Sequence, residues 1–289
     1  MTELTQIQKA LLLLALVLFG ALTIWFFTRS TPPVEIPAVE EPAPEPAVLV
    51  ATSTQTVIGT SVENRPIESY TFGTGDVDVL FVGGVHGGYE WNSIDLAYAM
   101  IDEFQMAPEL IPENITVHII PALNPDGYAK HLDPVTNYTD AAKRFNANGV
   151  DLNRNFDCKW APESSWRGQT VSAGTAAFSE PEAQALQDYV AKTTPAGAVF
   201  WHSVANNVYA SECENGILPM TLALMNTYAE AGNYGKVEKF DAYPITGDAE
   251  GWLASIGIPA VTVELETRDS IEWTRNKAGT LATLELFSQ

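Results

Sequence analysis

Between residue 56 and the C-terminus, short apolar runs alternate with segments of helical periodicity. Runs of this length, bounded by turn residues, are typical of buried strands, and the segments between them are typical of helices. Strands that alternate with helices favour a parallel sheet covered by helices. We therefore expect an α/β domain with a mixed, largely parallel sheet. The expected strands are 77–85, 115–123, 197–202 and 258–265, and the expected helices are 92–104, 180–192, 217–231 and 270–287.

Residues 10–27 form a different kind of segment, eighteen apolar or small residues without a charge. At about 1.5 Å per residue, a helix of this length just crosses the hydrocarbon core of a bilayer. A cleaved signal peptide is the alternative, but no A-x-A cleavage pattern follows, so we expect one retained transmembrane helix. Residues 1–9 would then lie inside the cell, 28–55 would form a Pro/Glu/Ala-rich linker, and 56–289 would be an extracytoplasmic domain at the cell membrane.

Charge and cysteine content limit the classes of partner and site. Fifteen Lys and Arg against thirty-six Asp and Glu give a net charge of -21, which argues against nucleic acid as a partner. Two cysteines are too few for a disulfide framework or a four-thiolate zinc site. In an exported domain, Cys158 and Cys213 are expected to bond to each other.

Polar side chains stand where the expected strands end, which is where open α/β sheets place their ligand sites. His86 and Glu90 follow the first strand, His202 closes the third, and Glu264 interrupts the last. Two imidazoles, one carboxylate and one open position form the usual catalytic zinc arrangement, and His86, Glu90 and His202 are expected to supply that set. Any one of these residues alone is a weak signal, but their shared placement predicts a metal site.

Five ordered motifs between residue 56 and the C-terminus resemble the zinc carboxypeptidase family, the metallopeptidases similar to carboxypeptidase A. The resemblance implies a central mixed sheet of about eight strands, one Zn²⁺ per chain, and hydrolysis of a peptide or amide bond. The motifs are GGVHGGYEW at 83–91, NPDGY at 124–128, GVDLNRNF at 149–156, HS at 202–203 and VTVEL at 261–265.

The first motif departs from the family pattern, which places the glutamate three residues after the histidine. Here Tyr89 fills that place and Glu90 stands one residue later. Either the loop contains a one-residue bulge that swings Glu90 inward, or the zinc loses a ligand and Glu90 lies exposed on the first turn of a helix. We expect the bulge, because the two glycines that precede Tyr89 permit it.

The resemblance also implies roles for residues beyond the metal ligands. Glu264 matches the catalytic glutamate that removes a proton from the attacking water, and Glu266, on the same face of the strand, is the runner-up. Arg144 would stabilise the oxyanion, and Asn153 with Arg154 would bind the terminal carboxylate of the substrate.

Tyr243 is spaced from Glu264 like the family's mobile tyrosine, which lies over bound substrate; a tyrosine packed on its own loop is the alternative. Glu250, seven residues after Tyr243, would lie at the floor of the pocket that binds the C-terminal side chain of the substrate. Asp248 could share that task. An acidic floor favours a cationic residue such as lysine, arginine or diaminopimelate.

These features predict a membrane-tethered, monomeric zinc metallocarboxypeptidase that acts on peptides or peptidoglycan stem peptides. One alternative is an amidohydrolase of the same fold that acts on N-acyl amino acids. Another is a zinc-free peptide-binding protein, which the displaced Glu90 suggests. Metal content separates the binding protein from the two enzymes.

Overall fold

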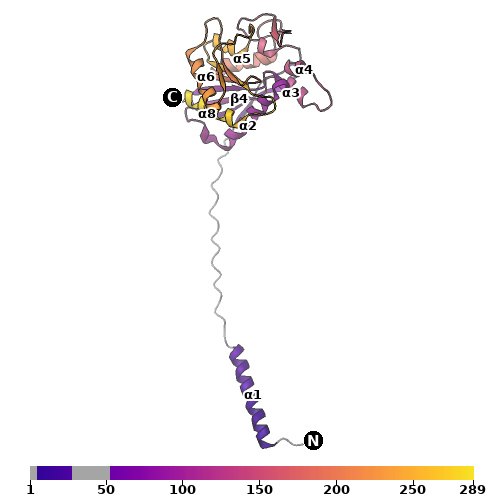
Figure 1. Ribbon diagram of the computed structural model, residues 1–289, viewed down its shortest axis with the longest axis vertical. Helices are drawn as coiled ribbons and strands as arrows, with labels where there is room; N and C mark the ends of the chain where they lie inside the picture. The colour runs from indigo at the N-terminus through magenta and orange to yellow at the C-terminus, as the bar shows by residue number, and fades with distance from the viewer. Residues whose placement is uncertain (1–4, 28–52) are drawn as a thin grey trace. The chain divides into compact units, whose positions relative to one another are not determined.

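The computed structural model describes residues 5–27 and 53–289, in two units that comprise residues 1–47 and 48–289 (Figure 1). The first unit contains helix α1 (Gln6–Phe27). Residues 6–25 of α1 have a mean hydropathy of 2.2. Within the part of the chain that the structure describes, α1 is the one helix that is long and apolar enough to cross a bilayer. A signal sequence meets the same criterion. Most of the expected linker lies outside the described residues.

The second unit is built on an eight-stranded sheet in the order β1-β2-β4-β3-β7-β10-β8-β9. The four middle strands β4, β3, β7 and β10 run parallel to one another. β1 and β2 pair antiparallel with their neighbours, whereas β8 is antiparallel to β10 and parallel to β9. This confirms the predicted mixed α/β fold. The strands are β1 (Thr54–Thr60), β2 (Pro66–Gly73), β3 (Val77–Val82), β4 (Ile115–Ile120), β7 (Gly197–Ser203), β8 (Asn207–Ala210), β9 (Gly235–Val237) and β10 (Ala260–Leu265), with a separate hairpin of β5 (Glu163–Trp166) and β6 (Gln169–Ser172).

Helices cover both faces of the sheet. In β3, Val79 and Phe81 pack into a core with α2, α6 and α8, whereas Leu80 and Val82 pack into a second core with α5 and α7. A strand buried on both faces needs apolar residues at every position, which explains the unbroken apolar runs. The helices are α2 (Trp91–Met106), α3 (Pro125–Leu132), α4 (Asp140–Arg144), α5 (Pro181–Thr193), α6 (Pro219–Gly232), α7 (Ala249–Ser255) and α8 (Trp273–Phe287), and the 3₁₀ turns are η1 (Gly87–Glu90), η2 (Pro108–Leu110) and η3 (Leu152–Arg154).

All eight elements expected from the periodicity are present, with ends that shift by a few residues. The strand expected over 77–85 stops at Val82 because Gly83 and Gly84 begin the turn toward η1. The helix expected from residue 270 begins at Trp273, because the preceding residues form a loop. The hairpin strand β1 is largely exposed and polar, so it left no apolar run in the sequence.

A disulfide bond joins Cys158 to Cys213, with a Cα–Cα distance of 6.0 Å. It connects the segment after the NRNF motif to the segment after β8. The predicted pairing is confirmed.

Candidate active site

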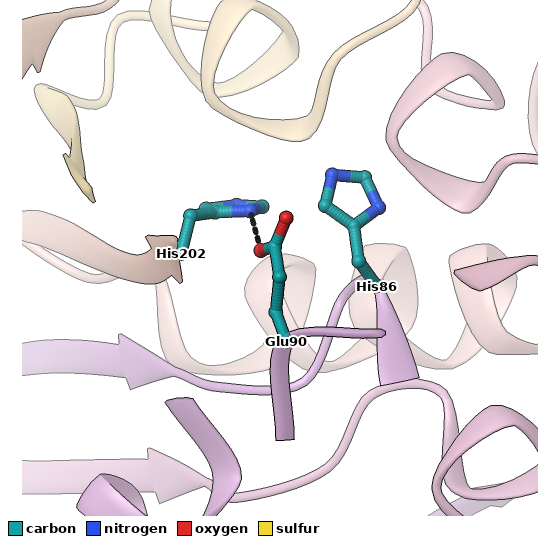
Figure 2. A group of neighbouring side chains, drawn as sticks. All are labelled: His86, Glu90 and His202. Carbon is teal, nitrogen blue, oxygen red and sulfur yellow. Dashed lines mark hydrogen bonds and ion pairs between the residues drawn. The ribbon is translucent and has the colours of Figure 1, made fainter. Parts of the chain in front are cut away.

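The loop between β3 and α2 determines where Glu90 points. Glu90 has φ -123° and ψ 49°, so it interrupts the helical backbone between η1 and α2. Gly87 has φ +48°, and a Cβ there would lie 2.8 Å from the carbonyl oxygen of Lys143. This non-helical junction takes up the extra residue of the loop. The Glu90 side chain is buried and turned toward two histidines rather than exposed on the first turn of α2 (Figure 2).

His86, Glu90 and His202 gather their donor atoms at the carboxyl ends of the central strands (Figure 2). One donor atom from each residue lies within 4.8 Å of the other two. Glu90 Oε2 is 2.9 Å from His202 Nδ1, and the two imidazole centroids are 4.9 Å apart. Residues from two separate parts of the chain, the β3–α2 loop and the end of β7, therefore form one buried donor cluster.

The chemistry of the cluster fits a zinc ion. His86 Nδ1 and His202 Nε2 are buried without a hydrogen-bond partner among the described residues. Buried polar atoms are almost always partnered, so unpaired atoms in a cluster of donors indicate room for a ligand. Two imidazoles and one carboxylate are the donors that catalytic zinc prefers.

The surroundings hold the two histidines in different protonation states. Burial, helped by the charge of Arg144, lowers the pKa of His86 well below its ordinary value, so this imidazole is neutral. Burial also disfavours the charged form of His202, but contacts with Glu250 and Glu90 outweigh it and raise the pKa of His202 to about 10. Without a metal, His202 is an imidazolium between two carboxylates.

Glu264 lies beside the cluster, because β10 pairs with β7 so that Glu264 is opposite His202. Its Oε2 atom is buried without a partner among the described residues. Burial, with the negative charge of Glu90, raises the pKa of Glu264 to about 7. A carboxyl group that ionises near neutral pH is suited to accept and return a proton.

Asp151 connects the cluster to an arginine. Its Oδ2 atom accepts a hydrogen bond of 2.9 Å from Arg144 Nε, and its Oδ1 atom is 3.6 Å from His86 Nδ1. The side chain is fully buried. Sequence reasoning assigned no role to Asp151, although it is part of the GVDLNRNF motif and so carried a signal.

Arg144 is also held through the NPDGY motif. Asn124 Oδ1 caps α3 by accepting from the backbone N–H of Gly127, and Asn124 Nδ2 donates to the carbonyl of Arg144. The Arg144 guanidinium lies 4.9 Å from the Trp166 ring centroid and 3.7 Å from Glu90 Oε1. The motif therefore positions a cation next to the donor cluster.

A cavity of about 760 Å³ opens over these groups. Arg154 lines it, with Nη1 donating to the carbonyl of Asn153 and Nε buried without a partner among the described residues. Asn153 Oδ1 accepts from the backbone N–H of Ala249 at the start of α7. The cavity thus brings the donor cluster, Glu264 and two arginines into one space.

A profile of the family described as zinc carboxypeptidase matches residues 51–274. The chain belongs to the zinc carboxypeptidase family. The fold and the donor cluster agree with that membership.

Relatives of this zinc carboxypeptidase family member include one enzyme named for a gamma-D-glutamyl-L-diamino acid and one named for a murein peptide. It is 24% identical over 242 residues to gamma-D-glutamyl-L-diamino acid endopeptidase 1 of Lysinibacillus sphaericus, covering 73% of this chain and 60% of that protein. It is 25% identical over 210 residues to murein peptide amidase A of Escherichia coli K12, covering 67% of this chain and 73% of that protein. The chain therefore spans less than two thirds of the first relative.

Solved structures show the same fold. The murein-tripeptide amidase of Escherichia coli O157 superposes with a TM-score of 0.62 at 22% identity, covering 85% of this chain and 97% of that one. Bovine thrombin-activatable fibrinolysis inhibitor superposes with a TM-score of 0.67 at 19% identity, covering 82% and 88%. At these identities the likeness concerns the fold.

The remaining predicted residues of this family member have distinct placements. Tyr243, Asp248 and Glu250 all line the cavity. Tyr243 is 39% exposed and its ring packs edge-on against Phe240, with centroids 4.8 Å apart. Asp248 caps α7 by accepting from the backbone N–H of Gly251.

Glu250 lies closer to the donor cluster than the sequence suggested. Its Oε1 atom is 3.3 Å from His202 Nε2 and accepts a hydrogen bond of 2.8 Å from Thr262 Oγ1. Burial would raise the pKa of Glu250, but the contact with His202 outweighs it and lowers that pKa. Glu250 therefore faces His202 of the donor cluster as well as the cavity.

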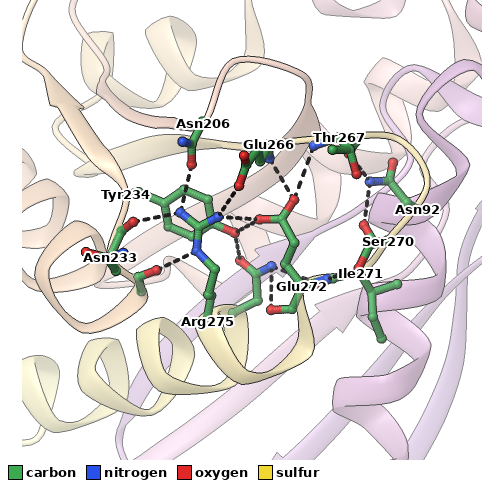
Figure 3. A network of polar contacts seen from close by, with 12 residues as sticks. Asn92, Asn206, Asn233, Tyr234, Glu266, Thr267, Ser270, Ile271, Glu272 and Arg275 are labelled. Carbon is green, nitrogen blue, oxygen red and sulfur yellow. Dashed lines mark hydrogen bonds and ion pairs between the residues drawn. The ribbon is translucent and has the colours of Figure 1, made fainter.

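Glu266, the runner-up for the catalytic base, lies outside the cavity lining. Its side chain is 60% exposed, and its Oε2 atom is 3.2 Å from Arg275 Nη1 (Figure 3). The geometry leaves Glu264 as the carboxylate beside the donor cluster.

Proposed function

We propose that this chain is a zinc-dependent carboxypeptidase that hydrolyses the C-terminal peptide bond of peptides, and in particular of peptidoglycan stem peptides. The observation that carries the proposal is the buried cluster of His86, Glu90 and His202 in one cavity with Glu264 and an arginine. The relatives named for murein and for gamma-D-glutamyl-L-diamino acid substrates favour the cell-wall peptide as substrate.

His86, Glu90 and His202 would hold the metal. Zinc, when bound, polarises a scissile carbonyl and lowers the pKa of water. Asp151 and Glu250, which lie beside His86 and His202, would help to position the two histidines.

Glu264 would act as the general base and acid. As a carboxylate it takes a proton from the attacking water, and as a carboxylic acid it returns that proton to the leaving nitrogen. Arg144, fixed by Asp151, would present its charge to the oxyanion that develops on the substrate. Because Arg144 is already oriented, this stabilisation needs no rearrangement during the reaction.

Arg154 and Asn153 would bind the terminal carboxylate of the substrate, since a guanidinium pairs with a carboxylate through two parallel hydrogen bonds. Tyr243 would close over the substrate from the rim of the cavity. The carboxylates of Asp248 and Glu250 would favour a cationic terminal side chain, such as that of a diamino acid.

We further propose that α1 anchors a monomer in the lipid bilayer by a single span, with the catalytic domain outside the cytoplasm. The hydropathy of α1 supports a membrane segment. The disulfide of Cys158 and Cys213 supports an oxidising compartment, because cytosolic thiols are kept reduced.

Metal analysis and a substrate panel test the activity. We expect one zinc per chain in the purified protein, and chelator-sensitive release of C-terminal Lys or diaminopimelate from stem peptides in preference to Leu or Glu from matched peptides. Glu264→Gln should keep the zinc and lose at least 10³-fold in kcat, in the usual range for a general base. His202→Ala should lose the metal.

Glu266→Gln is the matched control, because it removes a neighbouring carboxylate that lies outside the cavity. It should hydrolyse the panel like the parent protein. A zinc-free protein that binds these peptides without cleaving them, or normal turnover by Glu264→Gln, would rule out the proposed mechanism.

A further inference from the structure

Cationic side chains are concentrated in the cavity of this acidic protein. Five of the fifteen Lys and Arg residues line it, against five of the thirty-six Asp and Glu residues. Arg144 and Arg154 already have roles in the proposed function, whereas Arg268 has none. The cationic lining residues are Arg144, Arg154, Lys159, Arg167 and Arg268.

Arg268 lies in the cavity without a carboxylate partner. Its Nη2 atom donates to Tyr89 Oη at 2.9 Å and to the Ser203 carbonyl at 3.3 Å. Its Nε atom is buried and has no hydrogen-bond partner among the described residues. In the part of the chain that the structure describes, no Asp or Glu lies within ion-pair distance of it. A half-buried guanidinium that faces a cavity without a carboxylate partner retains the capacity to bind an anion.

A second guanidinium, that of Arg144, lies on the wall of the cavity that Tyr89 forms. The Cζ atom of Arg268 is 4.1 Å from the Tyr89 ring centroid, and the Cζ atom of Arg144 is 5.7 Å from the same centroid. Trp166 packs edge-on against Tyr89, with centroids 5.2 Å apart. Two cations therefore flank one aromatic ring, next to the loop that carries Glu90.

This wall is built from different elements than the site proposed for the terminal carboxylate. Arg154 is held by carbonyl groups of Asn153 and Ser165. Arg268 is instead held by Tyr89 and Ser203, the chain neighbours of two proposed zinc ligands. Arg154 and Arg268 therefore belong to separate parts of the cavity lining, which leaves Arg268 available for a second group of the substrate.

The loop that carries Arg268 is fixed before substrate binds (Figure 3). Glu272 Oε1 accepts from the backbone N–H groups of Glu266 and Thr267. Asn92 Nδ2 donates to the carbonyls of Thr267 and Ser270. Because this loop is already ordered, little further entropy is lost when Arg268 binds a ligand.

We propose that Arg268, together with Arg144, forms a second carboxylate subsite that recognises a carboxylate on the acyl side of the scissile bond. This inference rests on the proposed function and specifies its substrate as a peptide with two carboxylates. A glutamyl residue linked through its γ-carboxyl group has such a carboxylate, since its α-carboxyl group remains free. The name of the first relative, a gamma-D-glutamyl-L-diamino acid endopeptidase, contains this linkage.

Two peptides that differ in one group test the subsite, L-Ala-γ-D-Glu-L-Lys and its α-carboxamide analogue L-Ala-γ-D-isoGln-L-Lys. We expect the zinc-loaded full chain to prefer the free carboxylate by about tenfold to hundredfold in kcat/KM, the range for a charge-assisted hydrogen bond. Arg268→Gln should reduce this ratio to near one. Arg268→Lys, which keeps the charge without the planar group, should leave an intermediate ratio.

Arg167→Gln is the matched control, because Arg167 lines the same cavity but its side chain is 65% exposed. Its ratio of kcat/KM for the free-carboxylate peptide to kcat/KM for the carboxamide peptide should stay within about twofold of the parent value. If Arg268→Gln slows both peptides equally and leaves the ratio unchanged, Arg268 only supports Tyr89 and the subsite is wrong.

Binding separates this inference from the proposed activity. Titration calorimetry of both peptides into zinc-loaded Glu264→Gln protein should show tighter binding of the peptide with the free carboxylate. The Glu264→Gln/Arg268→Gln double variant should bind the two peptides with equal affinity. Absence of hydrolysis by the parent chain would contradict the proposed function while the calorimetric ratio still reports the subsite. Equal affinities for both peptides would contradict the subsite.

Discussion

The two histidines of the cavity illustrate how single residues are tuned by their neighbours. His86 faces a buried arginine and is neutral, whereas His202 lies between two carboxylates and is charged in the absence of metal. Only a neutral imidazole has a lone pair for a metal. Glu90 and Glu250 favour the protonated form of His202, and the proton competes with a metal ion for the imidazole lone pair.

Zinc binding should accordingly release a proton from His202. With its pKa raised to about 10, His202 is protonated at pH 8 in the metal-free protein and must lose that proton to coordinate zinc. We expect about one proton per zinc, measured by calorimetry in two buffers of different ionisation enthalpy. Glu250→Gln removes one carboxylate and should reduce the released fraction. Identical heats in the two buffers would contradict this prediction.

In the metal-free protein, Glu264 should lower the free energy of unfolding at neutral pH. Its pKa, raised by burial to about 7, lies above the unfolded value of roughly 4.3, so the folded state loses relative stability as pH rises through this interval. Glu264→Gln removes the penalty. Its free energy of unfolding should exceed that of the parent by about 1 to 3 kcal/mol above pH 7, with no gain below about pH 4.

Urea denaturation of the metal-free proteins across this pH range measures the difference. Glu266→Gln provides the comparison, because it removes an exposed carboxylate two residues away. It should show no such pH-dependent gain. A difference between Glu264→Gln and the parent that is constant from pH 4 to pH 8 would show that the carboxyl group is not perturbed by burial.

At the scale of elements, the junction of β3 with α2 decides whether Glu90 reaches the histidines. The loop approaches the backbone of α3 and α4 so closely that side chains at its glycines would collide with it. The NPDGY motif fixes those two helices from the other side, through the Asn124 contacts with Gly127 and Arg144. The β3–α2 loop and the NPDGY motif therefore contact the same two helices.

Gly87→Ala should damage the metal site. An alanine at φ +48° costs about 1 to 2 kcal/mol, and its Cβ would also press on the Lys143 carbonyl. We expect the zinc affinity, measured by competition with a chelator, to fall at least tenfold. Gly257→Ala is the control, since Gly257 also has a positive φ, +85°, but has open space around its Cβ position. That variant should lose some stability and keep its zinc affinity.

For the whole molecule, the distribution of charge matters more than its sum. A net charge of -21 repels polyanions at long range, yet one cavity collects a third of the Lys and Arg residues. Under the proposed function, a small anionic substrate would be recognised there at short range. The proposed selection of a peptide with two carboxylates is therefore compatible with a net charge that disfavours nucleic acid.

The full chain should fractionate with membranes when it is expressed in bacteria. Intact mass measurement of the membrane-bound product should include residues 1–27, because α1 is apolar along its length. Leu13→Arg with Leu16→Arg places two charges in the span and should move the protein to the soluble fraction. A product that begins after residue 27 would identify the segment as a cleaved signal sequence instead.

The sequence by itself determined the fold class, the eight main elements and the residues at the strand ends. Helical and strand periodicity are local properties, and a run such as the one that ends in His202 is readable from neighbouring residues alone. The motif resemblance added Glu264 and the arginines in the same way, because each motif lies within a short segment.

Tertiary structure alone decided which of these residues meet and what else joins them. Arg268 contacts Tyr89 across 179 positions, and Glu250 on helix α7 reaches His202 on strand β7. The junction at Glu90 turns inward only because α3 and α4 pack against its glycines. Such contacts depend on the packing of distant segments into one core, which local periodicity does not encode.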